Sequence, residues 1–327
     1  MEPTGEKLPQ HIDTAPLVQL VEQVQEQIGK VVVGQRNMID LLLAGLLADG
    51  HILIEGVPGV AKTLTAKLLS KLINAQFSRI QFTPDLMPSD VLGTSVFNPQ
   101  TASFQFKAGP IFSNLVLIDE INRAPAKTQA ALFEVMEERQ VTIDGHTNKL
   151  HAPFMVIATQ NPIEHEGTYR LPEAQLDRFL MKIMVGYPSL EEEVTILERN
   201  NVMAIVESLE EVQPVITPET LSFARQQVRN IHIEPKLLQF IAQLIHETRA
   251  DRSLYIGASP RASIALMQVA KALSVLRERD FVIPEDILQA APAVLRHRIS
   301  LTPEREMEGA TADEVIKEII SRLEIPR

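Results

Sequence analysis

The sequence predicts an α/β protein in which a doubly wound parallel sheet, with helices on both faces, is followed by an all-helical domain. Short apolar runs alternate with helical stretches as far as Gly186, a pattern typical of parallel strands buried on both faces. After Gly186 the strand-like runs cease, and prolines punctuate a series of helical segments. A chain of 327 residues is also too long for one ordinary core. We therefore expect a flexible segment over 1–14, a core domain over 15–186 and a helical domain over 187–327.

The spacing of the apolar residues places the expected elements. Intervals of three and four residues predict helices over 15–29 and 36–48, and later over 237–248 and 261–279. Two segments with an alternating pattern, 95–106 and 140–150, predict inserted β-hairpins. The runs that predict the strands of the sheet are 51–55, 79–82, 115–119, 154–159 and 181–185.

Composition and charge limit the classes of function. The chain has no cysteine, which excludes disulfides and thiolate metal sites and suits a reducing compartment. No segment has the pattern of a secretion signal or the length of a bilayer span, so we expect a cytoplasmic protein that does not span a membrane. The formal net charge of -11 repels a phosphate backbone, and bulk binding of nucleic acid is not expected. A pore loop with a local cluster of basic residues could still bind nucleic acid despite the net charge.

A phosphate-binding loop is predicted between the strand 51–55 and a helix over 64–72. Its sequence is Gly56-Val57-Pro58-Gly59-Val60-Ala61-Lys62-Thr63, which fits the P-loop pattern except that Ala61 replaces the second glycine. Alanine still permits a helix-like backbone, so the amides of 59–63 and the helix dipole can face phosphates. Lys62 would reach the β- and γ-phosphates of ATP, and the Thr63 hydroxyl would bind Mg²⁺. The alternative is a turn rich in glycine and proline before a helix that carries a lysine.

The expected strand 115–119 ends in two adjacent carboxylates, Asp119 and Glu120. Two acids at the end of a buried strand are unfavourable unless they do chemistry at the carboxyl edge of the sheet. Asp119 would hold Mg²⁺ through water, and Glu120 would orient and deprotonate the water that attacks the γ-phosphate. The alternative is an acidic strand end that begins a turn.

A polar amide is expected at the end of the strand 154–159, which runs into Gln160-Asn161-Pro162. If this strand is adjacent to the acidic one, the Asn161 side chain can hydrogen-bond the γ-phosphate or the attacking water. An Asn-Pro turn without a catalytic role is the alternative.

Four motifs, in this order, closely resemble the MoxR family of AAA+ ATPases, over residues 32–299. Besides the loop at 56–63 they are Leu117-Ile118-Asp119-Glu120-Ile121-Asn122-Arg123, Ala158-Thr159-Gln160-Asn161-Pro162 and Leu171-Pro172-Glu173-Ala174-Gln175-Leu176-Asp177-Arg178-Phe179. The resemblance implies an AAA+ ATPase core with β-hairpin inserts, a helical lid, and a homo-oligomeric ring of six subunits that binds ATP or ADP between neighbours. The hairpins at 95–106 and 140–150 correspond to the family's helix-2 insert and pre-sensor-1 insert.

The resemblance also implies roles for single residues. Asn161 falls on sensor 1, Arg178 on the arginine finger that enters the adjacent subunit's site, and Arg261 on sensor 2 of the lid. From the residues alone, Arg178 would form an ion pair with Asp177 or Glu173 of the same chain at a helix end, and Arg261 would be a solvated side chain in the first turn of a helix. Arg170 stands where the family pattern has proline, so the choice of finger between Arg170 and Arg178 stays open.

The segment 31–35 matches the family's segment beside the adenine, with a plain helix connection as the alternative. From the resemblance we expect an ATP hydrolase that moves its lid and hairpins to remodel or assemble client proteins. A separate von Willebrand factor A domain protein is the expected partner. Three other functions stay open: the motor subunit of a metal chelatase, a nucleic-acid translocase, and a scaffold that binds ATP but scarcely hydrolyses it. The charge argues against the translocase, and the complete set of turnover residues argues against the scaffold.

Overall fold

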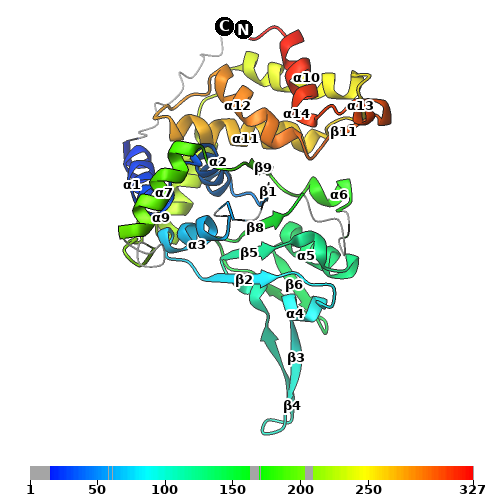
Figure 1. The fold of residues 1–327 in the computed structure, drawn as a ribbon. Coiled ribbons are helices and arrows are strands. Elements are labelled where there is room, and N and C mark those ends of the chain that lie inside the picture. The colour runs from blue at the N-terminus through cyan, green and yellow to red at the C-terminus, as the bar shows by residue number, and fades with distance from the viewer. Residues whose placement is uncertain are drawn as a thin grey trace, which may run out of the picture.

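A parallel sheet forms the centre of the molecule, as the alternation of strands and helices predicts (Figure 1). The computed structural model describes residues 15–57, 59–60, 62–162, 169, 171–202 and 209–326, so the segment 1–14 lies outside the described residues. The strands of this sheet are β1 (Ile52–Gly56), β2 (Phe77–Gln81), β5 (Leu115–Asp119), β8 (Met155–Gln160) and β9 (Met181–Val185). Within the described chain they lie in the order β2-β5-β8-β1-β9, and each neighbouring pair is parallel.

The central strands are buried on both faces, which explains their continuous apolar runs. In β1, Ile52 and Ile54 belong to one hydrophobic cluster, whereas Leu53 belongs to a second cluster on the other face. The same alternation separates Leu117 from Ile118 in β5. Side chains of a strand alternate between the two faces of a sheet, so both faces need a cover of helices.

Helices cover the two faces unequally. The first cluster joins the sheet to the leading helices and to helices of the C-terminal half of the chain, and the second joins it to the helices that follow β2 and β5. The helices before β9 are α1 (Ala15–Val31), α2 (Arg36–Leu47), α3 (Lys62–Leu72), α4 (Pro88–Leu92), η1 (Pro110–Phe112), η2 (Ile121–Arg123), α5 (Ala126–Glu138) and α6 (Glu173–Leu176).

The structure contains both predicted hairpins. The first pairs β3 (Gly93–Asn98) with β4 (Ser103–Ala108), and the second pairs β6 (Gln140–Ile143) with β7 (His146–Lys149). The first hairpin projects away from the sheet (Figure 1). Near its tip Phe97 and Phe104 face each other with ring centroids 5.3 Å apart, and they are 50% and 72% exposed. This hairpin therefore carries an aromatic pair into solvent.

The C-terminal half is helical, and proline begins most of its helices. Proline fits the first helical position because the N–H that it lacks would have no partner there. A short antiparallel pair, β10 (Leu254–Ile256) with β11 (Ser300–Leu301), differs from the expectation that strands cease after Gly186. These strands are too short to give a periodic signal in the sequence. The helices are α7 (Leu190–Val202), α9 (Pro218–Asn230), α10 (Pro235–Ala250), α11 (Pro260–Leu276), α12 (Pro284–Leu295), α13 (Pro303–Met307) and α14 (Ala312–Arg322).

The C-terminal helices pack directly on the sheet and on the leading helices. Helix α11 lies against α2, and α12 lies against β9. Their apolar side chains belong to the same cluster as one face of the sheet. The domain boundary at 186 stays a prediction. No helix of the described residues is long and apolar enough to cross a membrane.

The buried side chain of His51, directly before β1, forms hydrogen bonds with β8 and with α5. The Val156 N–H donates to Nδ1 of His51 at 2.9 Å, so Nε2 carries the proton and donates to the Met136 carbonyl at 3.1 Å. Both ring nitrogens are used in the neutral form. Burial lowers the pKa of His51 to about 4, because the charged form would lose its hydration.

Acid should therefore destabilise the fold through His51. The unfolded chain binds a proton at the ordinary pKa of 6.5, and the folded chain binds it only near 4, so this contribution to stability is complete above pH 6.5 and is lost as the pH falls. Its size is on the order of 3 kcal/mol. Of this contribution, about 2 kcal/mol should be lost between about pH 7 and about pH 5, and urea unfolding at these two pH values measures that loss. The variant His51→Gln should lose less free energy of unfolding over this interval, and an equal loss would contradict the assignment.

Candidate functional site

The carboxyl edge of the sheet brings three of the predicted motifs together. In the sheet β8 lies between β1 and β5, with Glu55 opposite Gln160 and Ile118 opposite Ala158. Because all three strands run in the same direction, the residues after them meet at one edge. The loop after β1, the acids at the end of β5 and Asn161 after β8 are therefore neighbours.

The predicted phosphate loop has the backbone that its glycines permit. Gly59 has a φ of 87°, in the left-handed region that favours glycine. A Cβ at Gly56 would lie 2.6 Å from the Val185 carbonyl oxygen, so glycine also allows β1 to approach β9. Lys62 begins α3, and its Nζ donates to the Gly56 carbonyl at 2.5 Å. Pro58 and Ala61 lie outside the described residues.

Asp119 is held by two polar side chains although its own side chain is only 9% exposed. Arg79 of β2 donates from Nε to Oδ2 of Asp119 at 2.6 Å. The Thr159 hydroxyl donates to Oδ1 at 3.1 Å and accepts from the Glu120 N–H at 3.1 Å. Thr159 therefore fixes the two acids relative to β8.

Glu120 has a strained backbone and a held carboxylate. Its φ of 57° is in the left-handed region, which costs a residue with a Cβ about 1 kcal/mol or more. Gln81 Nε2 donates to Oε2 at 2.8 Å, and Arg123 Nε lies 3.0 Å from the same oxygen. Sequence reasoning missed Arg79, Gln81 and Thr159. Polar residues at alternate positions of β2 were the available signal, because they share one face of the strand.

Two further predicted segments lie at this edge of the sheet. Asn161 is buried directly after β8. In the connection between α1 and α2, Gln35 donates from Nε2 to the Gly186 carbonyl at 3.1 Å, and Gly186 follows β9. A cavity of about 360 Å³ lies here, and Val32, Val33 and Gly34 are among the residues that line it. This volume is large enough for a small ligand. The segment predicted to lie beside adenine thus borders a cavity.

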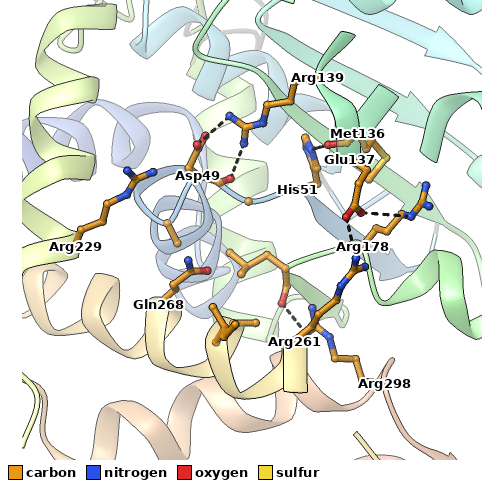
Figure 2. A pocket seen from close by; sticks show the side chains of 15 residues that line it. Asp49, His51, Met136, Glu137, Arg139, Arg178, Arg229, Arg261, Gln268 and Arg298 are labelled. Atoms are coloured by element: carbon orange, nitrogen blue, oxygen red, sulfur yellow. Dashed lines mark hydrogen bonds and ion pairs between the residues drawn. The ribbon is translucent and has the colours of Figure 1, made fainter. Parts of the chain in front are cut away.

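Arg178 and Arg261 lie together at a different place, where they share one carboxylate (Figure 2). Glu137 Oε1 lies 2.8 Å from Arg261 Nη2, and its Oε2 lies 3.6 Å from Arg178 Nε. Asp177, which was one expected partner of Arg178, instead pairs with Arg298. Arg170 lies outside the described residues.

This arginine group is at the amino edge of the sheet. The surrounding cavity, of about 340 Å³, is lined by Gly50 and His51, which precede β1, and by Leu180, which precedes β9. The length of a five-residue strand, about 16 Å, therefore separates it from the phosphate loop. The structure does not bring Arg178 and Arg261 to the Lys62 loop of the same chain. The arginines that line the cavity are Arg139, Arg178, Arg229, Arg261 and Arg298.

Comparison with known proteins agrees with the fold and the motifs. Residues 51–181 match the ATPase family associated with various cellular activities (AAA), and residues 246–319 match the AAA lid domain. The chain is 49% identical to YeaC of Bacillus subtilis, over 94% of this chain and 95% of the relative. It is 41% identical to the chaperone MoxR1 of Mycobacterium tuberculosis, over 95% of this chain and 83% of the relative. A crystal structure of a Cytophaga hutchinsonii protein assigned as an ATPase superposes with a TM-score of 0.88, at 44% identity over 96% of this chain and 97% of that one.

The sheet, the motif order and the two domain matches define an AAA+ ATPase core with an AAA lid. Within that class, the chain belongs to the MoxR family, whose members include a chaperone. The predicted fold class and family are confirmed.

Proposed function

We propose that this chain hydrolyses ATP with the help of Mg²⁺ and uses the reaction to remodel or assemble client proteins in the cytoplasm. The observation that carries the proposal is the single sheet edge that holds the Lys62 loop, the adjacent acids Asp119 and Glu120, and Asn161. A cation, two acids and an amide on neighbouring strand ends are the groups that phosphoryl transfer to water requires. Membership of the AAA family supports nucleotide binding at this edge.

The residues present suit a triphosphate and Mg²⁺. The Lys62 ammonium bonds a carbonyl of its own loop, a contact that an anion in the loop can replace. Magnesium usually takes one or two carboxylates together with phosphate and water oxygens. Asp119 and the Thr63 hydroxyl would supply these few protein ligands. Among the described residues, no group of three or more His, Cys, Asp or Glu side chains could hold a metal ion. When bound, the ion neutralises charge on the phosphates.

The residues of the chain divide the work of hydrolysis between them. Lys62 and the loop amides hold the phosphates, and the Asn161 amide orients the γ-phosphate or the attacking water. Glu120 accepts a proton from that water as it attacks, and the phosphoryl group leaves ADP. Gln81 and Arg123 position the Glu120 carboxylate through their contacts with its Oε2 atom.

A second copy of the chain would complete the site. Arg178 and Arg261 lie at the amino edge of their own sheet, so they can reach a γ-phosphate only when it is bound by a neighbour. Repetition of a head-to-tail contact generates a ring when its rotation closes, and we propose a closed ring of six subunits. A guanidinium supplied in trans can raise the rate by about 10³ to 10⁵. Hydrolysis would then depend on assembly.

The projecting hairpin gives the ring a means of contact with a client. Its exposed Phe97 and Phe104 offer an apolar surface to unfolded or partly folded polypeptide. A von Willebrand factor A domain protein is the proposed partner that would present the client. This remodelling role goes beyond the ATPase reaction and depends on it.

Substitutions at the carboxyl edge should separate binding from turnover. Glu120→Gln keeps the shape but removes the base, so the variant should bind ATP with unchanged affinity and lose turnover by at least about 10²-fold. Lys62→Ala should instead lose affinity for ATP. Calorimetry with MgATP and a phosphate-release assay measure the two effects. Turnover of Glu120→Gln at the unsubstituted rate would refute the role of Glu120 as base.

Mixing inactive subunits tests whether the arginine acts in trans. Arg178→Ala should bind ATP but not turn it over. When it is mixed with Glu120→Gln, some sites combine an intact Glu120 with an intact Arg178 from the neighbour, and activity should partly return. Phosphate release at several mixing ratios is the measurement. Absence of recovery at every ratio would count against a site shared between subunits.

A further inference from the structure

The backbone on both sides of Arg178 is held by one buried arginine, Arg298, which follows α12. Its Nε donates to Asp177 Oδ1 at 2.7 Å. Nη2 donates to the Phe179 carbonyl at 2.6 Å and to the Asp177 carbonyl at 3.3 Å. Nη1 donates to the Leu180 carbonyl at 2.9 Å. The accepting atoms thus belong to Asp177, which precedes Arg178, and to Phe179 and Leu180, which follow it.

The guanidinium of Arg298 has little freedom to move. Its side chain is 3% exposed, and a fifth bond, from Nη1 to the Val294 carbonyl at 2.6 Å, anchors it to its own helix. These contacts with described residues match the number of N–H donors that a guanidinium carries. Lysine has fewer donors and lacks the planar fork, so it cannot replace them. The geometry of this segment depends on arginine at position 298.

The same contact joins Arg178 to Arg261. The second carboxylate oxygen of Asp177 accepts from the Ser259 hydroxyl at 3.0 Å, and Ser259 is the N-cap of α11, in whose first turn Arg261 lies. Glu137 contacts both guanidinium groups from the other side (Figure 2). The two arginines are therefore connected at their backbones through Asp177 and at their tips through Glu137.

We propose that Arg298 is a positioning residue for ATP hydrolysis: it sets the backbone around Arg178 and keeps Arg178 in register with Arg261, so that the pair meets a neighbour's phosphate as one unit. This inference rests on the proposed trans action of Arg178. Arg298 itself is buried beneath the segment and acts through Arg178. The hydrogen bonds of Arg298 lie between the end of α12 and the start of β9.

Displacement of a catalytic group by about 1 Å can lower the rate on the order of 10²-fold. Arg298→Lys should therefore reduce kcat by about 10- to 100-fold, because the segment around Arg178 shifts. The Lys62 loop lies at the other edge of the sheet, so the Kd for MgATP should stay within about twofold. Phosphate release and calorimetry with MgATP give the two values.

Arg296 supplies a matched control from the same turn of chain. It pairs with Asp313 through Nε at 2.8 Å and Nη2 at 2.9 Å, and it donates to the Lys182 carbonyl at 3.0 Å, but these contacts do not involve the segment around Arg178. Arg296→Lys should lower the thermal unfolding temperature and leave kcat unchanged. An equal loss of kcat in Arg296→Lys and Arg298→Lys would overturn the positioning role.

Mixing Arg298→Lys subunits with Glu120→Gln subunits distinguishes two causes of a lower kcat: misplaced arginines, or damage to the nucleotide site of the Arg298→Lys subunit itself. Arg298→Lys subunits keep an intact Glu120, so Glu120→Gln subunits with well-placed arginines should restore part of the activity. If Arg298→Lys does not fold, Asp177→Asn replaces it in the same assays, with a kcat lower on the order of tenfold expected because the charged partner of Arg298 is lost.

Three further results overturn the inference. They are an unchanged kcat in the folded variant, a Kd for MgATP raised well beyond twofold, and no recovery on mixing where Arg178→Ala recovers. Full turnover by Arg178→Ala would refute the trans arginine itself, and the inference would fall with it.

Discussion

The parallel direction of β1, β8 and β5 is the constraint on which the rest of the structure depends. Each strand ends at the same edge, so a loop, an amide and two acids that are far apart in the sequence become neighbours. The strands are apolar on both faces because helices cover both, which leaves the edge as the place for polar groups. Thr159 then fixes Asp119 and Glu120 by hydrogen bonds across the strands.

The same sheet separates the two halves of the proposed reaction. The groups proposed to bind the phosphates lie at the carboxyl edge, and Arg178 and Arg261 lie at the amino edge. Strand length sets this separation, and small movements of side chains cannot remove it. Each subunit would then contribute its phosphate-binding residues to one site and its arginines to the site of a neighbour. Arg298 and Arg296 bond the Leu180 and Lys182 carbonyls and so join the end of α12 to the start of β9. In contrast to the lid movement expected from the sequence, we therefore expect the nucleotide cycle to change the contacts between subunits more than these contacts within one subunit.

Sequence reasoning located the groups whose signal is local. The phosphate loop, the acid pair and both hairpins were predicted because each depends on a few consecutive residues. The partners of those groups were not predicted, because they depend on which strands pair. Arg79 and Gln81 reach the acids only through the pairing of β2 with β5. Arg298 reaches Asp177 across more than a hundred residues, a contact for which the sequence alone gave no signal.

Turnover per chain as a function of protein concentration tests the central claim most directly, because a site divided between subunits works only in the assembly. Phosphate release would be measured at saturating MgATP across the range in which sedimentation shows the chain going from monomer to ring. The account predicts that the rate per chain rises in proportion to the assembled fraction. A rate per chain that stays constant down to the monomer would contradict it.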